Sequence, residues 1–259
     1  MNILYKMSAV VLKYLFLGFI VLISLIPLLW GLLSSFKNNA EILLSPFSLP
    51  EVWSFSNYTE AFRTAPIARY YLNSLSITAM CIIGGLLIFS MAAYVFAFYD
   101  FKGKKALFST LSLSLLVPPT AIIFPVYLII NRMGLYNSKL GLTLVYLALA
   151  LPTVLYVLKS FFMSIPKELE EAARIDGASF VRIFVSIMLP LTTPALATSA
   201  ILIFLASWND FLYALILTSG DRARTVPIAL TQFTGLYGAK YGQLFASSML
   251  VVIPSIILY

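Results

Sequence analysis

The 259-residue sequence is 61% hydrophobic and only 10% charged, and its mean hydropathy is +0.97. Roughly a quarter of the residues of a soluble domain are charged, so this composition excludes an ordinary soluble fold and indicates a membrane protein. The net charge of +7 is expected of basic loops beside anionic lipid headgroups, and we expect no nucleic-acid partner.

Six apolar segments are long enough, or nearly so, to cross a membrane as helices of about 20 residues. We therefore predict an all-α transmembrane fold, with a single transmembrane domain over residues 1–259. The expected spans are residues 10–33, 72–98, 106–130, 140–162, 188–217 and 244–259. The first run is too long for a cleaved signal peptide. The sixth is short and lacks a charged anchor, so we expect that a C-terminal tail is missing.

Clusters of lysine set the expected orientation, because cytoplasmic loops carry an excess of basic residues. Lys6 and Lys13 come before the first span, and three lysines crowd the turn 100–105 after the second. Two crossings separate these clusters, so both fall on one side. We predict a cytoplasmic N-terminus and a cytoplasmic segment 164–182.

Prolines fall inside each of the third to sixth expected spans, where each removes a backbone hydrogen bond and bends the helix. Broken helices are tolerated where neighbours or a cavity satisfy the freed carbonyls, and they favour a transporter over a simple anchor. In the second span, Gly84 and Gly85 predict close helix packing. The prolines are Pro118, Pro119, Pro125, Pro152, Pro190, Pro194 and Pro254.

The residue types that most enzymes and metal sites need are nearly missing. The chain has no histidine, the commonest metal ligand and general base, and one cysteine, Cys81. Cys81 lies in an apolar run and is expected to be buried. The sequence has no GxxxxGK[ST] phosphate-binding loop either. We predict no catalytic residue, no metal site and no enzymatic activity for this chain.

The segment between the fourth and fifth spans predicts two short helices. Glu170 and Arg174 are four residues apart, as an ion pair on one helix requires. Gly177 is placed to end the first helix, and Ser179 is placed to cap the second. The letters of this segment are SIPKELEEAARIDGASFVRIFVSIMLP.

Leu169, Ala172, Ala173 and Asp176 share one face of the first of these helices, by their spacing. Small side chains on this face allow another surface to approach closely. One interpretation is a docking helix for a cytoplasmic partner. The alternative is an amphipathic linker that lies in the headgroups.

This segment resembles the signature cytoplasmic loop of ABC importer permeases. The matching residues are Glu171, Ala172 and Ala173, then Gly177, then Ile187 to Pro190 at the family's spacing. The resemblance implies a type I ABC importer permease fold with a coupling helix between spans four and five. The closest likeness is to the second permease subunit of maltose-type carbohydrate importers. The residues implied to contact the ATPase are Glu171, Ala172, Ala173, Asp176, Gly177, Leu189 and Pro190.

The resemblance also implies a set of partners. These are a second permease subunit that forms a heterodimer with this chain, a dimer of ATPases and an extracytoplasmic solute-binding protein. The ATPases would bind ATP and magnesium, so this chain would bind no cofactor. The substrate would be a sugar or oligosaccharide, and the location a bacterial or archaeal plasma membrane. A polyamine or glycerol-phosphate substrate stays open within the same family.

The segment Trp208, Asn209, Asp210 and Phe211 lies inside the fifth apolar run and is similar to a segment of carbohydrate importers. A carboxylate at membrane depth is costly and is a candidate for function. Aromatic neighbours suit stacking on a sugar ring, so these four residues are pathway candidates. The alternative is a polar group that packs against a neighbouring helix, beside a tryptophan at the interface.

The glycine-rich loop before the last span is expected outside the cell. It resembles the loop that reaches into the binding protein, which makes Gly235, Tyr237, Gly238 and Tyr241 candidates for that contact. The alternative is a plain connection. An ion-driven secondary transporter is a competing function, but it predicts several buried charged groups, and the spans hold little besides Asp210.

Overall fold

The computed structural model describes residues 3–235 and 238–258. Four of its helices are long and apolar enough to cross a membrane, and there are up to six crossings if each of two bent helix pairs is one span. The chain divides into two compact units. The first is Met1–Ile67 with Ala229–Ile256, and the second is Ala68–Ile228 with Ile257–Tyr259. That the chain acts as a single domain stays a prediction.

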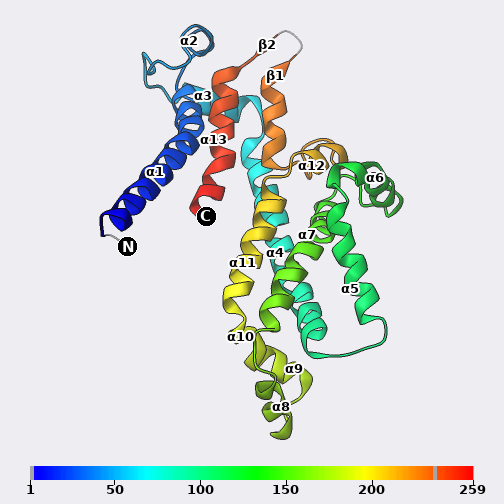
Figure 1. Ribbon diagram of the computed structural model, residues 1–259. Coiled ribbons are helices and arrows are strands. Elements are labelled where there is room, and N and C mark those ends of the chain that lie inside the picture. The colour runs from blue at the N-terminus through cyan, green and yellow to red at the C-terminus, as the bar shows by residue number, and fades with distance from the viewer. Residues whose placement is uncertain (1–2, 236–237, 259) are drawn as a thin grey trace. The chain divides into compact units, whose positions relative to one another are not determined.

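The first unit is built around two long helices joined to small elements. Trp30 of the first long helix packs edge-on against Phe245 of the other, with ring centroids 5.0 Å apart. The side chain of Gln243 donates a 2.7 Å hydrogen bond to Glu60. The elements are α1 (Ile3–Ser34), α2 (Asn39–Leu44), α3 (Ser56–Thr64), the antiparallel strands β1 (Thr234–Gly235) and β2 (Gly238–Ala239), and α13 (Tyr241–Leu258) (Figure 1).

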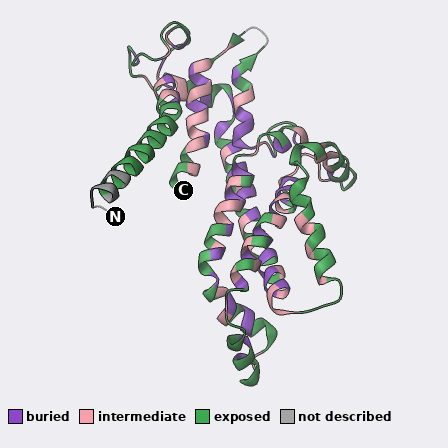
Figure 2. Ribbon diagram, in the orientation of Figure 1, coloured by how far each residue is buried: buried purple, intermediate pink, exposed green. Residues whose placement is uncertain are grey.

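The core of the second unit lies among α4 (Ile67–Phe98), α7 (Lys139–Phe162) and α11 (Thr193–Trp208). These helices bury side chains along much of their length, whereas α1 of the first unit is exposed almost throughout (Figure 2). Cys81 on α4 is fully buried, as its apolar surroundings predict. Their apolar sequences thus form a packed core and not only a lipid-facing surface.

The third expected span is a bent pair of helices. The helix α5 (Lys104–Leu113) continues as η1 (Ser114–Leu116). A bend of 100° then leads to η2 (Pro119–Ile122) and α6 (Ile123–Arg132). The bend falls at Pro118, because proline offers no N–H and holds the residue before it out of the helical region.

The fifth expected span, residues 188–217, is also broken. Its helical part begins earlier, with α9 (Phe180–Ile183), the π-helix η3 (Phe184–Met188) and α10 (Leu189–Leu191). An 80° bend at Thr192 leads into α11. After Trp208 the backbone leaves the helix and resumes as α12 (Leu212–Leu217), followed in the chain by η4 (Val226–Phe233). The bend lies beside Pro190 and Pro194, where the sequence predicts a bent helix. The bounds 188–217 of this span stay a prediction.

Gly85 brings α4 into close contact with α7 and α11, as its place in the sequence predicts. A Cβ atom there would lie 2.7 Å from Cδ1 of Ile203 and 3.2 Å from Cδ2 of Leu147. We expect Gly85→Val to lower the free energy of unfolding by about 1–3 kcal/mol, because a well-packed core resists added volume. Denaturant unfolding in detergent measures this. The control is Gly84→Val, whose Cβ would meet Leu147 at an ordinary 3.6 Å. Equal losses in both variants would contradict the prediction.

Candidate functional site

The helix α8 (Glu168–Ile175) forms where the sequence predicts a short helix. Acidic residues fill its first turn, where the helix dipole favours negative charge. Gly177 ends it in the left-handed conformation, at φ +78°. The N–H of Gly177 donates to the carbonyl of Arg174, and that of Ala178 to Ala173, both at 3.0 Å. This pair of bonds is the Schellman arrangement, which favours glycine at that position.

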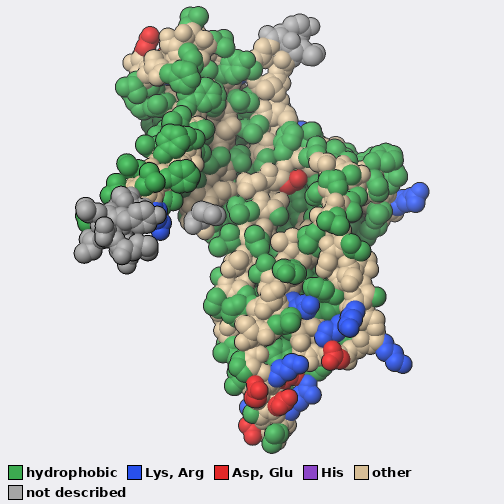
Figure 3. All heavy atoms as spheres, in the orientation of Figure 1, with side chains coloured by type: hydrophobic (Ala, Val, Ile, Leu, Met, Phe, Trp, Pro, Cys, Tyr) green, Lys and Arg blue, Asp and Glu red, His purple; other side chains and the backbone are tan. Residues whose placement is uncertain are grey.

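The second predicted helix also begins as expected. The side chain of Ser179 accepts a hydrogen bond from the N–H of Arg182 and caps α9. The connection between α7 and α11 therefore contains the two predicted short helices, α8 and α9. Both lie at one end of the second unit (Figure 1). Acidic and basic side chains gather at this end (Figure 3).

The faces of α8 differ from the prediction in one respect. Ala173 is only 7% exposed and belongs to the core of this chain. Leu169, Ala172 and Asp176 lie on the exposed side together with Glu171. Of the two alanines on the predicted contact face, Ala172 is exposed and available to a partner. Ala173 is buried, because it packs against its own chain.

Glu170 connects α8 to the end of α4. This carboxylate is 5% exposed and accepts a 2.6 Å hydrogen bond from the hydroxyl of Tyr99. The guanidinium of Arg174 donates to Glu170 at 2.5 Å and to the Tyr99 hydroxyl at 2.6 Å. These bonds raise the pKa of Arg174 above its usual value, with Glu170 as the largest cause. The predicted ion pair of Glu170 and Arg174 is confirmed, and Tyr99 makes it part of a three-membered cluster.

A cluster of aromatic rings continues this connection into the unit. Tyr94 is fully buried on α4. Its ring lies 5.2–5.7 Å, between centroids, from five other rings. Those rings belong to Phe98, Tyr99, Phe162, Phe180 and Phe184. The ends of α4 and α7 and the start of α9 are therefore packed together just above α8.

The 80° bend at Thr192 separates this packed end from α11. Thr192 is fully buried, and its hydroxyl donates to the carbonyls of Met188 at 2.7 Å and Leu189 at 3.0 Å. The π-helix η3 precedes this bend, separated from it only by the short helix α10, and π-helical turns often occur at functional sites. Leu189 is partly buried against the core and Pro190 is exposed, so these two predicted residues lie at the bend and away from the face of α8.

Trp208 is fully buried and cannot stack on a ligand in this structure. Its ring stacks on Phe204, with centroids 5.5 Å apart, and meets Tyr71 edge-on at 5.3 Å. Tyr213 is buried as well, and its hydroxyl donates to the carbonyl of Pro119. Packing within the chain therefore uses both rings, and this structure does not present Trp208 to a sugar. The role of Trp208 in the pathway stays a prediction.

Asp210 lies at the gap between α11 and α12 and is bonded to a neighbouring helix. Its carboxylate accepts a 2.8 Å hydrogen bond from the hydroxyl of Tyr146 on α7, and a 3.0 Å bond from the N–H of Ala214. This geometry favours the packing interpretation of Asp210. Asn209 and Phe211 are exposed, so they are the members of the predicted set that another molecule can reach.

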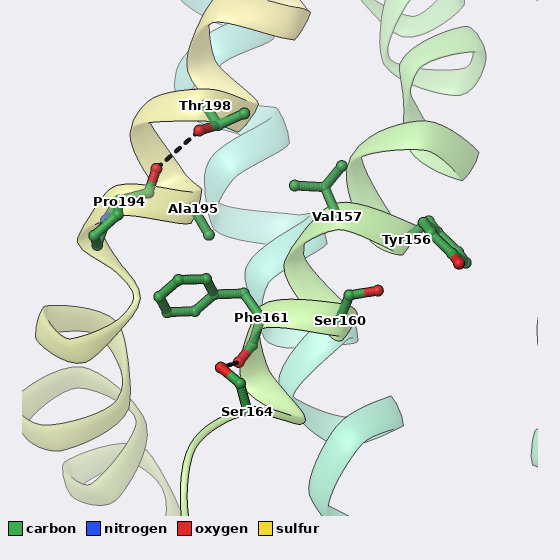
Figure 4. A pocket seen from close by; sticks show the side chains of 8 residues that line it. All are labelled: Tyr156, Val157, Ser160, Phe161, Ser164, Pro194, Ala195 and Thr198. Atoms are coloured by element: carbon green, nitrogen blue, oxygen red, sulfur yellow. Dashed lines mark hydrogen bonds between the residues drawn. The ribbon is translucent and has the colours of Figure 1, made fainter. Parts of the chain in front are cut away.

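A hollow of about 500 Å³ lies between α7 and α11 (Figure 4). Its polar groups are hydroxyls, and none of the residues that line it is charged. The Phe161 ring points across the gap toward α11 in Figure 4. The hydroxyls of Ser164 and Thr198 donate to backbone carbonyls three and four residues earlier in the chain. The side chains of Tyr156 and Ser160 point away from α11 in Figure 4, so the hollow is uncharged and mainly apolar. The lining residues are Tyr156, Val157, Ser160, Phe161, Ser164, Pro194, Ala195 and Thr198.

The predicted glycine-rich loop is a short hairpin, in which Thr234 pairs with Ala239 and Gly235 with Gly238. Gly238 has a φ of +142°, which favours glycine. Tyr237 lies outside the described residues, and Tyr241 begins α13. Among the described residues, no group of three or more His, Cys, Asp or Glu side chains is placed to hold a metal ion.

Residues 84–259 match the family described as binding-protein-dependent transport system inner membrane component. The chain belongs to this family. It is 40% identical to the diacetylchitobiose uptake system permease protein NgcG of Streptomyces coelicolor, over 92% of this chain and 79% of that protein. It is 34% identical to the trehalose transport system permease protein SugB of Mycobacterium tuberculosis, over 90% and 86%.

The permease also matches a solved structure, that of a bacterial ABC transporter involved in the import of the acidic polysaccharide alginate. The TM-score is 0.83 at 21% identity, over 100% of this chain and 96% of that one. The predicted type I ABC importer permease fold is confirmed, and the permease is a multi-pass membrane protein. Tyr99 is a residue of the site that could not be predicted from the sequence, because it follows an apolar helix and no local pattern distinguishes it.

Proposed function

We propose that this permease is the membrane-spanning subunit of an ATP-driven importer for a sugar or oligosaccharide. Relatives that are 33–40% identical are permeases of uptake systems for diacetylchitobiose, trehalose, trehalose/maltose and arabinooligosaccharides. The hollow between α7 and α11 has no charged lining residue, so it offers no ion-pair partner for a polyamine or a phosphate.

The single observation that carries the coupling role is the exposed face of α8, held in place by Glu170 and Tyr99. Glu171, Ala172, Asp176 and Gly177 form the exposed surface that would enter a cleft of a partner ATPase. Movement of α8 by the ATPase would be transmitted to the end of α4 through the hydrogen bond between Glu170 and Tyr99. The bend at Thr192 would let α11 change its direction relative to α10. The partner ATPases would bind ATP and magnesium, so this chain would hold no cofactor.

The remaining subunits follow from the same proposal. A second permease would complete the pathway as a heterodimer, and a solute-binding protein outside the cell would deliver the sugar. The hairpin at Gly235 and Gly238 is the proposed contact for that protein, together with Tyr237 and Tyr241. Asn209 and Phe211 are the proposed pathway residues. The location is a bacterial or archaeal plasma membrane with a cytoplasmic N-terminus.

Co-purification tests the proposal directly. The permease is tagged, extracted in mild detergent, and the proteins that come with it are identified by mass spectrometry. An ATPase, one second permease and a sugar-binding protein are expected, and the preferred ligand of that binding protein then identifies the substrate. Recovery of this chain alone, or only with copies of itself, would contradict the proposal.

Asp210 provides a test against an ion-driven carrier. We expect Asp210→Asn to keep uptake within about threefold, because an amide oxygen can still accept a bond from Tyr146 and one hydrogen bond is worth about 0.5–1.5 kcal/mol. Uptake of labelled sugar is measured with and without a proton-gradient uncoupler under constant ATP. The control is Asp210→Leu, which keeps no acceptor and is expected to lose more. Complete loss of uptake in the asparagine variant, as for a proton carrier, would contradict this prediction.

A further inference from the structure

The end of α2 and the connection from α2 to α3 expose large apolar side chains. We call residues 43–55 the apolar loop. The surfaces of soluble proteins rarely carry a large contiguous apolar patch, and such patches mark contacts with other proteins or with membranes. The side chains that are 61–86% exposed include Leu43, Leu44, Phe47, Leu49, Trp53 and Phe55.

A buried lysine holds the apolar loop in shape. Lys37 has no exposed surface. Its ammonium donates to the carbonyls of Ser45 at 3.0 Å and Pro46 at 3.2 Å, and to the hydroxyl of Ser48 at 3.3 Å. This cation fills the inside of the turn, so the apolar side chains around it cannot fold inward. The hydrogen bonds of Lys37 therefore keep these apolar side chains on the outside of the loop.

A second bond sets the level of the loop along α1. The indole N–H of Trp30 donates to the carbonyl of Pro46 at 2.9 Å. Trp30 lies one turn before the end of α1 at Ser34, which is about 6 Å along the helix axis. The loop thus returns to the side of the spanning helix instead of extending away from it. Tryptophan is typical of the boundary between lipid and water, so the loop is held at that depth.

The surface of the loop continues the surface of α1. Only 6% of the apolar window of α1 is buried within the chain. Hydrophobic side chains cover both the loop and the helix on the face in view (Figure 3). Within residues 43–55 the one charged residue is Glu51, and its N–H donates to the carboxylate of Glu41. A mainly apolar surface with one charged residue, beside a spanning helix, suits acyl chains better than an aqueous contact.

We propose that the apolar loop lies in the outer leaflet of the bilayer, with Leu44 and Phe47 at the boundary between headgroups and acyl chains. The occupant of this surface is lipid. Apolar groups at that boundary enter about 5–10 Å into the membrane, which would resist movement of α1 along its own axis. The proposal depends on the membrane location of the permease and not on its substrate.

Collision accessibility measured by electron paramagnetic resonance tests the depth of the loop. Leu44→Cys and Phe47→Cys are each made in a Cys81→Ser background, spin-labelled in the assembled transporter in lipid nanodiscs, and exposed to oxygen or to a water-soluble nickel chelate. The control is Glu51→Cys on the same loop. The signal of the Cys81→Ser parent is subtracted. We expect oxygen to be the more effective collider at positions 44 and 47, and the nickel chelate at position 51.

Two results would overturn the proposal. Dominant collisions with the nickel chelate at positions 44 and 47 would place the loop in water. Weak collisions with both reagents would show that a protein partner covers it. Leu44 and Phe47 are 83% and 86% exposed, so their replacement leaves the packed interior unchanged. Elution of the labelled complex at the same volume as the Cys81→Ser parent in size-exclusion chromatography verifies the fold. Failure of the sugar proposal with lipid contact intact would leave the inference standing.

Discussion

Replacement of Glu170 by alanine is expected to uncouple transport from ATP hydrolysis. The variant leaves the Tyr99 hydroxyl and the Arg174 guanidinium without their shared partner, so α8 loses its connection to α4. Hydrogen bonds to charged groups contribute about 1.5–3 kcal/mol, and a loss of about 2 kcal/mol lowers the population of the aligned helix roughly thirtyfold. Uptake per ATP hydrolysed, measured in proteoliposomes with the binding protein, should fall by about tenfold or more.

Glu168→Ala is the matched control for that experiment. It removes the same charge from the same helical turn, but Glu168 is exposed. We expect its ratio of uptake to hydrolysis to stay close to that of the unchanged protein. Tyr99→Phe removes the hydroxyl alone and should give an intermediate loss. If Glu170→Ala and Glu168→Ala behave alike, the Glu170 cluster has no part in coupling.

Gly177→Val is expected to abolish uptake while insertion into the membrane continues. The φ of +78° is strained for any residue with a side chain, and more so for a β-branched one, at a cost of about 1–3 kcal/mol. Apart from its two chain neighbours, no heavy atom of the described residues lies within 4 Å of the Cβ position, so a larger side chain there would meet a partner and not this chain. Gly177→Asn separates the two effects, because asparagine tolerates this backbone conformation. Loss of uptake with asparagine identifies the docked surface as the cause.

Gly134 offers a control with the same geometry at another place. It ends α6 at φ +70°, with a 3.0 Å bond from its N–H to the carbonyl of Asn131, and its Cβ position is also open. Gly134→Val thus carries similar strain without touching α8. Uptake should survive in this variant, and immunoblots of membranes should show equal amounts of both proteins. Equal loss of uptake in both would mean that strain alone explains Gly177→Val, and the docking role would fail.

Local rules predicted the parts of the site that depend on near neighbours in the chain. The pairing of Glu170 with Arg174 and the end of α8 at Gly177 follow from helix geometry over a few residues. The contact of Glu170 with Tyr99 joins residues 71 positions apart, and no periodic pattern encodes it. Composition could not show that Trp208 is buried either, because an aromatic residue beside polar ones suits both a pathway and a core. Packing by Phe204 and Tyr71 decided between them.

The π-helix η3 makes the length of its segment as important as its residues. Its bond runs from the N–H of Leu189 to the carbonyl of Phe184, five residues back, so this turn holds one residue more than an α-helical turn. Deletion of a single residue between 184 and 188 would turn the π-helix into an α-helical turn, and the residues on either side would keep nearly the same direction, because the wider turn already accommodates the extra residue. Insertion of a further residue would not be accommodated in this way and would rotate Leu189 and Pro190 by about 100° relative to α8. We therefore expect uptake to be more sensitive to a one-residue insertion in this segment than to a one-residue deletion between 184 and 188.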